Sequence, residues 1–206
     1  MFYYINGKLA WLDTNFAVID AGGVGYKMTI SQNTYAAMPP RYTPTEAPTV
    51  KLYSYMAVRE DGIELFGFIS EEELNAFKML ITVSGVGPKA AISILSQLSP
   101  TKLAIAICTE DKKSISQANG IGPKTAARII LELKDKLKNQ FSEEDAGEET
   151  QIISSTNQSS KLGDAQDALS VLGYSKSEAL SALKGIDTST LELDEIIKLA
   201  LKKLMK

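Results

Sequence analysis

The pattern of apolar and polar residues changes once along this chain, near residue 70. Before that point, short runs rich in β-branched and aromatic residues predict strands. Five such runs lie at residues 2–5, 16–19, 26–30, 50–55 and 63–66. Turn-forming pairs separate them, at Asn6-Gly7, Gly22-Gly23 and Asp61-Gly62. This spacing predicts a small closed β-barrel of the OB-fold type at residues 1–66.

From residue 71 onward the apolar residues recur at helical spacing. Leu74, Phe77, Leu80 and Ile81 form one apolar stripe. Further helices are expected at residues 88–97, 101–107, 111–118 and 123–138. Ser99-Pro100 provides a helix start and Asn119-Gly120 a helix end. Residues 67–140 are therefore expected to form a helical domain.

The last third of the chain divides into a linker and a small bundle. Residues 141–160 are acidic and then rich in Ser, Thr, Asn and Gln, which is the composition of a flexible linker. Beyond it, three short helices are expected near residues 162–172, 175–184 and 192–205. The last of these is more apolar than one buried face requires. We therefore expect residues 161–206 to form a three-helix bundle that offers apolar surface to a partner.

Composition excludes several classes of enzyme. The chain has no histidine and a single cysteine, Cys108. This removes histidine acid–base catalysis, Ser-His and Cys-His nucleophiles, multi-cysteine zinc sites and an internal disulfide. No GxxxxGK[ST] phosphate loop is present, so we expect no ATP hydrolysis by this chain alone, no cofactor and no metal. No apolar run reaches the ~20 residues of a membrane span and no signal peptide is evident, which predicts a cytoplasmic protein without membrane contact.

Charge is distributed unevenly, although the net charge is only -3. Residues 83–140 hold nine basic and four acidic side chains, a regional charge of +5. Residues 141–160 hold five acidic side chains and no basic one. Positive charge is thus concentrated in one central segment, as expected of a phosphate-binding surface.

An internal repeat lies within this basic segment. SGVGPKAA at residues 84–91 recurs as NGIGPKTA at residues 119–126, thirty-five residues later. Each copy predicts a tight turn between two helices, with its apolar residue (Val86 or Ile121) pointing inward to hold the helices together. The glycines leave backbone N–H groups open, and the proline suits the first position of the next helix.

The repeat predicts a DNA-backbone contact. Each new helix presents its positive end to the surface, and Lys89 or Lys124 adds a charge beside it. Such contacts recognise the shape of the backbone and depend on salt, without reading base sequence.

Three other interpretations of these residues are open. Residues 85–90 fit a loose GxGxxA dinucleotide fingerprint, but that motif needs a preceding strand and residues 72–82 carry a helical stripe. A DNA glycosylase or nuclease could use the hairpins for docking, but would need a catalytic carboxylate, lysine or metal cluster, and none is evident. A structural DNA-bridging protein that recruits no motor is the third.

The motifs taken together resemble one known family. The paired hairpins, Gly22-Gly23-Val24-Gly25-Tyr26, and Val58-Arg59-Glu60-Asp61 followed by Leu65-Phe66-Gly67-Phe68 resemble the RuvA family, the DNA-binding subunits of the bacterial Holliday junction branch-migration complex. The resemblance covers residues 1 to about 140, and the linker and small helical domain continue it.

The resemblance implies a function and a set of partners. Members of this family form homotetramers, and one or two tetramers hold an open four-way junction during recombination, DNA repair and the SOS response. They dock a hexameric, ATP-driven AAA+ motor of the RuvB type, here through residues 161–206, and a junction-resolving nuclease is a further partner. Leu172-Gly173-Tyr174 is a helix–loop signature of ubiquitin-associated-like (UBA-like) folds.

Carried over residue by residue, the resemblance also implies site residues. The phosphate contacts would be made by Gly85, Gly87, Lys89, Gly120, Gly122, Lys124 and Arg128. The second hairpin of the family often has lysine where this chain has Pro123, which removes one charge contact.

The resemblance further implies an acidic pin, formed by Glu60 and Asp61, that points at the junction centre. Carboxylates there would repel phosphates and hold strands apart at the crossover. Arg59 would contact strands near the crossover. From the sequence alone, Asp61-Gly62 also fits an ordinary hairpin turn and Arg59 an exposed salt bridge.

Overall fold

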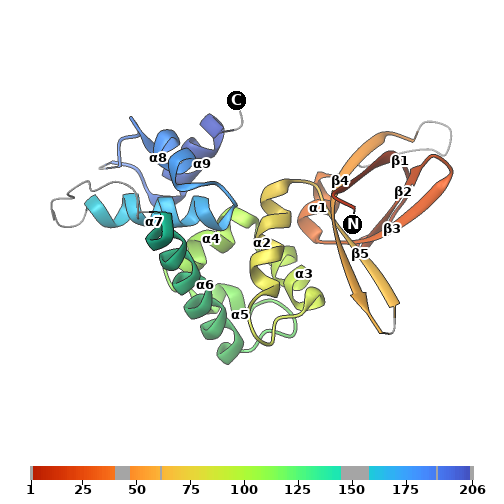
Figure 1. Cartoon of the computed structure of the whole chain (residues 1–206), viewed down its shortest axis with the longest axis horizontal. Coiled ribbons are helices and arrows are strands. Elements are labelled where there is room, and N and C mark those ends of the chain that lie inside the picture. Colours follow the sequence, from red (N-terminus) through yellow and green to blue (C-terminus); the bar gives the residue numbers. More distant parts are fainter. Residues whose placement is uncertain (1, 40–46, 61, 145–157, 189, 205–206) are drawn as a thin grey trace.

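The computed structural model of this chain describes residues 2–39, 47–60, 62–144, 158–188 and 190–204. A five-stranded barrel comes first, followed by the helices that carry the two hairpins and then by a three-helix bundle (Figure 1). This order confirms the predicted fold class.

The barrel closes on itself. Its strands are β1 (Tyr4–Leu12), β2 (Phe16–Ala21), β3 (Val24–Ile30), β4 (Thr49–Arg59) and β5 (Gly62–Phe68). They are ordered β1-β2-β3-β5-β4, with β3 and β5 parallel and the other described pairs antiparallel. Alternate side chains, such as Leu9, Ile19 and Leu52, point inward and form a separate apolar core. Closure pairs the sheet edges that would otherwise be exposed.

Two features of the barrel differ from the sequence prediction. The prediction of a turn at Asn6-Gly7 is wrong, because Gly7 lies inside β1 and pairs with Val50 of β4. A Cβ at Gly7 would come within 2.1 Å of the Asp20 carbonyl oxygen, so glycine here permits close approach of β2. A short helix, α1 (Gln32–Ala37), was also not expected.

Five helices follow the barrel. They are α2 (Glu71–Ile81), α3 (Pro88–Gln97), α4 (Pro100–Cys108), α5 (Lys112–Ser116) and α6 (Pro123–Glu144). Ser99 caps α4 as predicted, because its side chain accepts the Lys102 N–H. The ring of Phe77 on α2 packs against Phe68 of β5, with 4.8 Å between centroids. The helices are therefore built directly onto the end of the barrel.

The C-terminal bundle contains α7 (Gln158–Val171), α8 (Lys176–Leu183) and α9 (Leu193–Leu204). Because α6 runs to Glu144 and α7 begins at Gln158, the linker expected at residues 141–160 is helical at both ends. Residues 145–157 lie outside the described residues.

The bundle packs against the hairpin helices. One apolar core continues from α2 to α9, and α7 lies along α4 (Figure 1). The Tyr174 hydroxyl donates to Glu72 Oε1 at 2.7 Å, and Asn75 Nδ2 donates to the Leu172 carbonyl at 3.3 Å. Cys108 on α4 lies in this shared core, and its burial raises the pKa of its thiol to about 12. Part of the apolar surface expected to face a partner is therefore covered by this chain itself.

Candidate nucleic-acid interface

The first hairpin joins α2 to α3. Gly85 has a φ of 86°, in the left-handed region that glycine enters without a Cβ penalty. Val86 is buried, and its N–H donates to the Val83 carbonyl at 3.0 Å. Gly87 is extended, and Pro88 opens α3. An apolar residue thus holds the turn from inside, and both glycines lie at the surface.

The second hairpin joins α5 to α6 and repeats this geometry. Gly120 has a φ of 83°, and the buried Ile121 donates its N–H to the Ala118 carbonyl at 3.0 Å. The Ala126 N–H donates to the Gly122 carbonyl at 2.9 Å, which closes the first turn of α6. Both hairpins follow a helix, so the structural context of a dinucleotide fingerprint is not met at the first one.

The second glycine of each hairpin faces open space. Apart from the glycine itself and its two chain neighbours, no atom of the described residues lies within 4 Å of the position that a Cβ would take at Gly87 or Gly122. Neither residue has a φ in the left-handed region. The described fold therefore gives no reason for glycine at these two positions, whereas close approach by another molecule's backbone would give one.

The start of each following helix is electropositive. Lys89 and Lys124 are exposed at the second position of α3 and α6. No side chain caps the N-terminus of α3. The unpaired N–H groups of a helix start attract anions, and a lysine beside them adds to this attraction. Each hairpin can thus bind a phosphate oxygen through backbone and side chain together.

Three hydrogen bonds tie the hairpins and their helices to each other. Ser93 Oγ on α3 donates to the Asn119 carbonyl at 2.9 Å, and Arg128 Nη1 on α6 donates to the Ser84 carbonyl at 3.4 Å. Glu132 accepts the Ser84 N–H at 3.3 Å. Ser93 and Arg128 are thirty-five residues apart, as are Ser84 and Asn119, so the internal repeat relates the Ser93 contact to the Arg128 contact. Sequence reasoning missed this bracing, although the repeat distance could have indicated it.

The hairpin formed by β4 and β5 extends away from the rest of the barrel (Figure 1). Arg59 and Gly62 form its last described register pair. Arg59 and Glu60 are exposed, as a DNA-contacting turn requires. Asp61, the second residue of the expected acidic pin, lies outside the described residues.

A cavity of about 200 Å³ lies between this turn and the start of α3. It is lined by Ala57, Arg59, Gly62, Ile63, Glu64 and Lys89. The structure thus brings Arg59 and Lys89 together, although the sequence placed them in separate features. Lys124 and Arg128 do not line this cavity. Two cations against the single carboxylate of Glu64 make its lining electropositive.

Neither a metal site nor a single membrane-spanning helix is found among the described residues. Among them, no group of three or more His, Cys, Asp or Glu side chains is arranged to hold a metal ion. No single described helix is long and apolar enough to cross a membrane; α3 and α4 pass that test only as a pair, bent by 95°.

Comparison with known proteins assigns each region. Residues 1–67 match the RuvA N terminal domain, residues 77–135 the SAM-like Helix-hairpin-helix tandem, and residues 160–205 the RuvA, C-terminal domain. Similar proteins carry the name Holliday junction branch migration complex subunit RuvA. The one from Acetivibrio thermocellus is 44% identical over 207 residues, and the one from Clostridium beijerinckii 45% over 206, each covering 100% of both chains. With all three regions matched and this identity along the whole length, the chain belongs to the RuvA family.

Proposed function

We propose that this chain binds four-way DNA junctions through its two hairpins and the β4–β5 turn. It acts as a non-catalytic subunit of a Holliday junction branch migration complex, on DNA in the cytoplasm. One observation carries the assignment of the surface: Gly87 and Gly122 occupy equivalent, open positions in two repeated hairpins. Lys89 and Lys124 stand beside them at electropositive helix starts.

The hairpins are suited to grip the sugar–phosphate backbone of a DNA arm. A phosphate oxygen would accept hydrogen bonds from backbone N–H groups at Gly85 and Gly87, and from their counterparts at Gly120 and Gly122. Lys89 and Lys124 would add charge to these contacts. Arg128, which already donates to the Ser84 carbonyl, is exposed enough to reach a phosphate with its remaining donors.

The β4–β5 turn is suited to the centre of the junction. The carboxylates of Glu60 and Asp61 would repel phosphates and disfavour continuous duplex at that point. Arg59 and Lys89, which line one cavity, would attract the strands as they leave the crossover. Attraction beside the centre and repulsion at it together favour an open junction over a linear duplex.

The test is a gel shift over a series of salt concentrations, comparing a synthetic four-way junction with linear duplex of equal arm length. We expect a preference for the junction that persists as salt rises, because only the junction can engage hairpins and turn together. Equal, weak binding to both that vanishes with modest salt would leave only generic backbone contacts.

Four copies of the chain would match the four arms of the junction. We therefore propose a homotetramer, with one or two tetramers per junction. Sedimentation of the chain with and without junction DNA should give the mass of four or eight copies. A stable monomer on the junction would contradict this proposal.

A junction-resolving nuclease is proposed as a further partner, which would act on the same open DNA.

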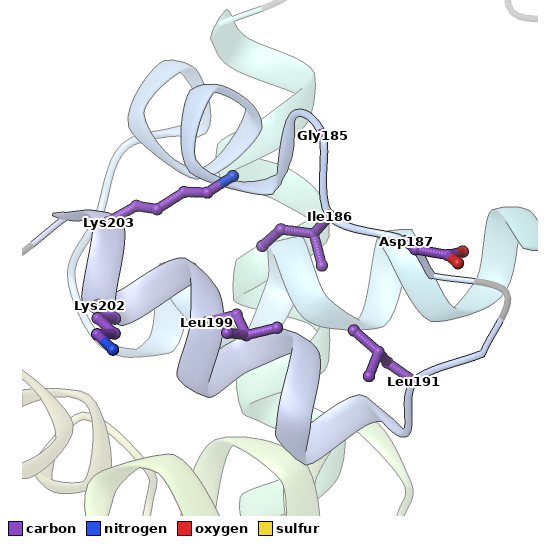
Figure 2. Close-up of a pocket in the computed structure, with 7 residues that line it drawn as sticks. All are labelled: Gly185, Ile186, Asp187, Leu191, Leu199, Lys202 and Lys203. Carbon is purple, nitrogen blue, oxygen red and sulfur yellow. The ribbon is translucent and has the colours of Figure 1, made fainter.

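The C-terminal bundle is proposed to bind a hexameric AAA+ motor of the RuvB type. An apolar cavity of about 320 Å³ lies between α9 and the loop that precedes it. Ile186, Leu191 and Leu199 face it together, and Lys202 lies at its edge (Figure 2). Leu199 is 42% exposed, although it is a large apolar side chain on an ordered helix. An apolar side chain of the motor could fill this cavity.

Leu199→Asp tests this proposal, with Leu180→Asp as its matched control. Leu180 on α8 is 43% exposed and does not line the cavity. The first variant should lose stimulation of the motor ATPase on junction DNA, and the second should keep it. Equal activity of both variants would exclude this cavity as the docking site.

A further inference from the structure

Glu73 is the only charged residue among the buried polar side chains of the described residues, with 1% of its surface exposed. It lies in the first turn of α2, the helix that leads into the first hairpin. Burial raises the pKa of its carboxyl group, while hydrogen bonds from Ser31 and Thr34 oppose that rise. Burying a carboxylate costs free energy unless its oxygens are hydrogen-bonded.

Both carboxylate oxygens of Glu73 are bonded to the start of α1. Ser31 Oγ donates to Oε1, and Thr34 Oγ1 donates to Oε2 at 2.6 Å. Each hydroxyl also accepts a backbone N–H: Ser31 from Thr34 at 3.0 Å, and Thr34 from Ile69 at 3.1 Å. The hydrogens of both hydroxyls are thereby directed at the carboxylate.

These bonds connect the barrel to the hairpin helices. Helix α1 lies between β3 and β4 and is part of the barrel segment, whereas Glu73 belongs to α2. Helix α1 is also bonded to the C-terminal end of α3. Asn33 Nδ2 donates to the Leu98 carbonyl at 3.0 Å, and the Gln32 N–H donates to Ser96 Oγ at 3.1 Å. Helix α1 is therefore hydrogen-bonded to both helices of the first hairpin.

We infer that Glu73 is a positioning residue for junction recognition, which it serves by fixing the first hairpin relative to the β4–β5 turn. Packing of the Phe77 ring against Phe68 of β5 also holds the two regions together, but aromatic packing tolerates a wider range of angles than a hydrogen bond does. The two hydroxyl–carboxylate bonds are directional, so they set the angle between barrel and helices. That angle decides whether Arg59 and Lys89 line the same cavity.

This inference rests on the proposed function and adds a consequence to it. A linear duplex needs only the hairpins, whereas an open junction needs the hairpins and the turn at a fixed separation. Removing the bonds between Glu73 and α1 should therefore weaken junction binding and leave duplex binding unchanged. A merely structural role would weaken both, in proportion to the folded fraction.

The experiment measures the dissociation constants of the full-length chain for junction and duplex, at a temperature where every variant is folded. Glu73→Ala should raise the junction constant by about tenfold and change the duplex constant by less than about twofold, since effective concentration between two linked contacts falls when their geometry loosens. Glu73→Gln keeps the shape and one acceptor, and should recover most of the selectivity.

Ser54→Ala is the matched control. Ser54 is 2% exposed and donates to the Phe2 carbonyl at 2.7 Å, a buried hydroxyl contact that stays within the barrel. It should leave both dissociation constants unchanged. If Glu73→Ala does not fold, Thr34→Val removes one of the two bonds to Glu73, together with the acceptor of the Ile69 N–H, at nearly constant volume, and should give a smaller loss in the same direction.

Two failures are distinguishable. If the wild-type chain does not prefer the junction, the proposed function itself fails. If the wild-type chain prefers the junction and the folded Glu73 or Thr34 variants keep that preference, Glu73 does not position the hairpin and this inference alone is overturned.

Discussion

The two hairpins of this chain have the same local structure in different surroundings. Gly85 and Gly120 have φ values of 86° and 83°, and Val86 and Ile121 donate equivalent 3.0 Å hydrogen bonds. The helices around them differ, since α2 has 11 residues and α5 has five. A short sequence therefore fixes this turn without help from helix length.

The surroundings distinguish what each hairpin can recognise. The first is attached to the barrel through α1, and its Lys89 shares a cavity with Arg59 of the β4–β5 turn. The second continues into α6, the longest of the described helices, and Lys124 does not line that cavity. We therefore expect the first hairpin to bind DNA near the crossover. The second should bind duplex DNA equally well in a junction arm and in a linear duplex.

The largest expected effect comes from Gly87→Ser and Gly122→Ser. Gly87 has φ -86° and ψ 174°, which suit a helix cap, and serine is a better cap than glycine, so α3 should keep or slightly gain stability. The serine side chain would occupy the open face and accept an N–H meant for phosphate. A lost hydrogen bond to a charged group costs about 1.5–3 kcal/mol, so each change should weaken junction binding by about 10- to 100-fold.

Gel shifts and thermal melts of both single variants and the double variant provide the measurement. Equal losses of junction affinity in the two single variants would support equivalent DNA contacts by the two hairpins. Full junction affinity in the double variant would rule out the two open glycines as DNA-contacting positions.

The second prediction separates the two lysines. Lys89→Ala should weaken junction binding more than duplex binding, because Lys89 lines the same cavity as Arg59. Lys124→Ala should weaken both equally. Each should lower the slope of log affinity against log salt by about 0.9 for each phosphate that the lysine neutralises in the wild type. Identical junction-to-duplex ratios in the two variants would mean that the shared cavity has no bearing on the crossover.

Sequence patterns predicted the local structure around the hairpins well. The expected helix at residues 88–97 matches α3 at both ends, because Pro88 starts it and Ser99-Pro100 starts the next. The repeat also located both turns, since glycine and proline constrain the backbone without reference to distant residues. That these turns contact DNA stays a prediction.

Contacts between distant segments could not be predicted in this way. Helix α1 has six residues, too few for a periodic pattern, so the sequence did not predict it. The packing of α7 on α4, and the approach of Arg59 to Lys89, depend on tertiary geometry. Asn6-Gly7 resembled a turn, although Gly7 instead permits two strands to approach.

A smaller effect is expected from the Ser93 and Arg128 bonds, two of those that brace the hairpins. Ser93→Ala removes a 2.9 Å bond and should lower the free energy of unfolding by about 0.5–1.5 kcal/mol. Arg128→Ala should lower it by less, because that side chain is exposed and its bond measures 3.4 Å. If Arg128 also contacts phosphate, only its variant should lower the salt slope. Urea denaturation and salt titration of both variants measure these differences.

The smallest effect concerns how the first helix of each hairpin is capped. The Ser70 hydroxyl caps α2, whereas the Asp111 carboxylate caps α5 and accepts from Ser114. Hydrogen bonds from Ser114 lower the pKa of Asp111, so the charged cap stabilises the fold fully above the ordinary aspartate pKa of about 3.9. That contribution is lost as the pH falls through the lowered value. Asp111→Asn keeps a good cap that does not titrate. Its stability should therefore fall less than that of the wild type in urea denaturation between neutral pH and pH 3, and parallel curves would show that the cap charge does not distinguish the second hairpin from the first.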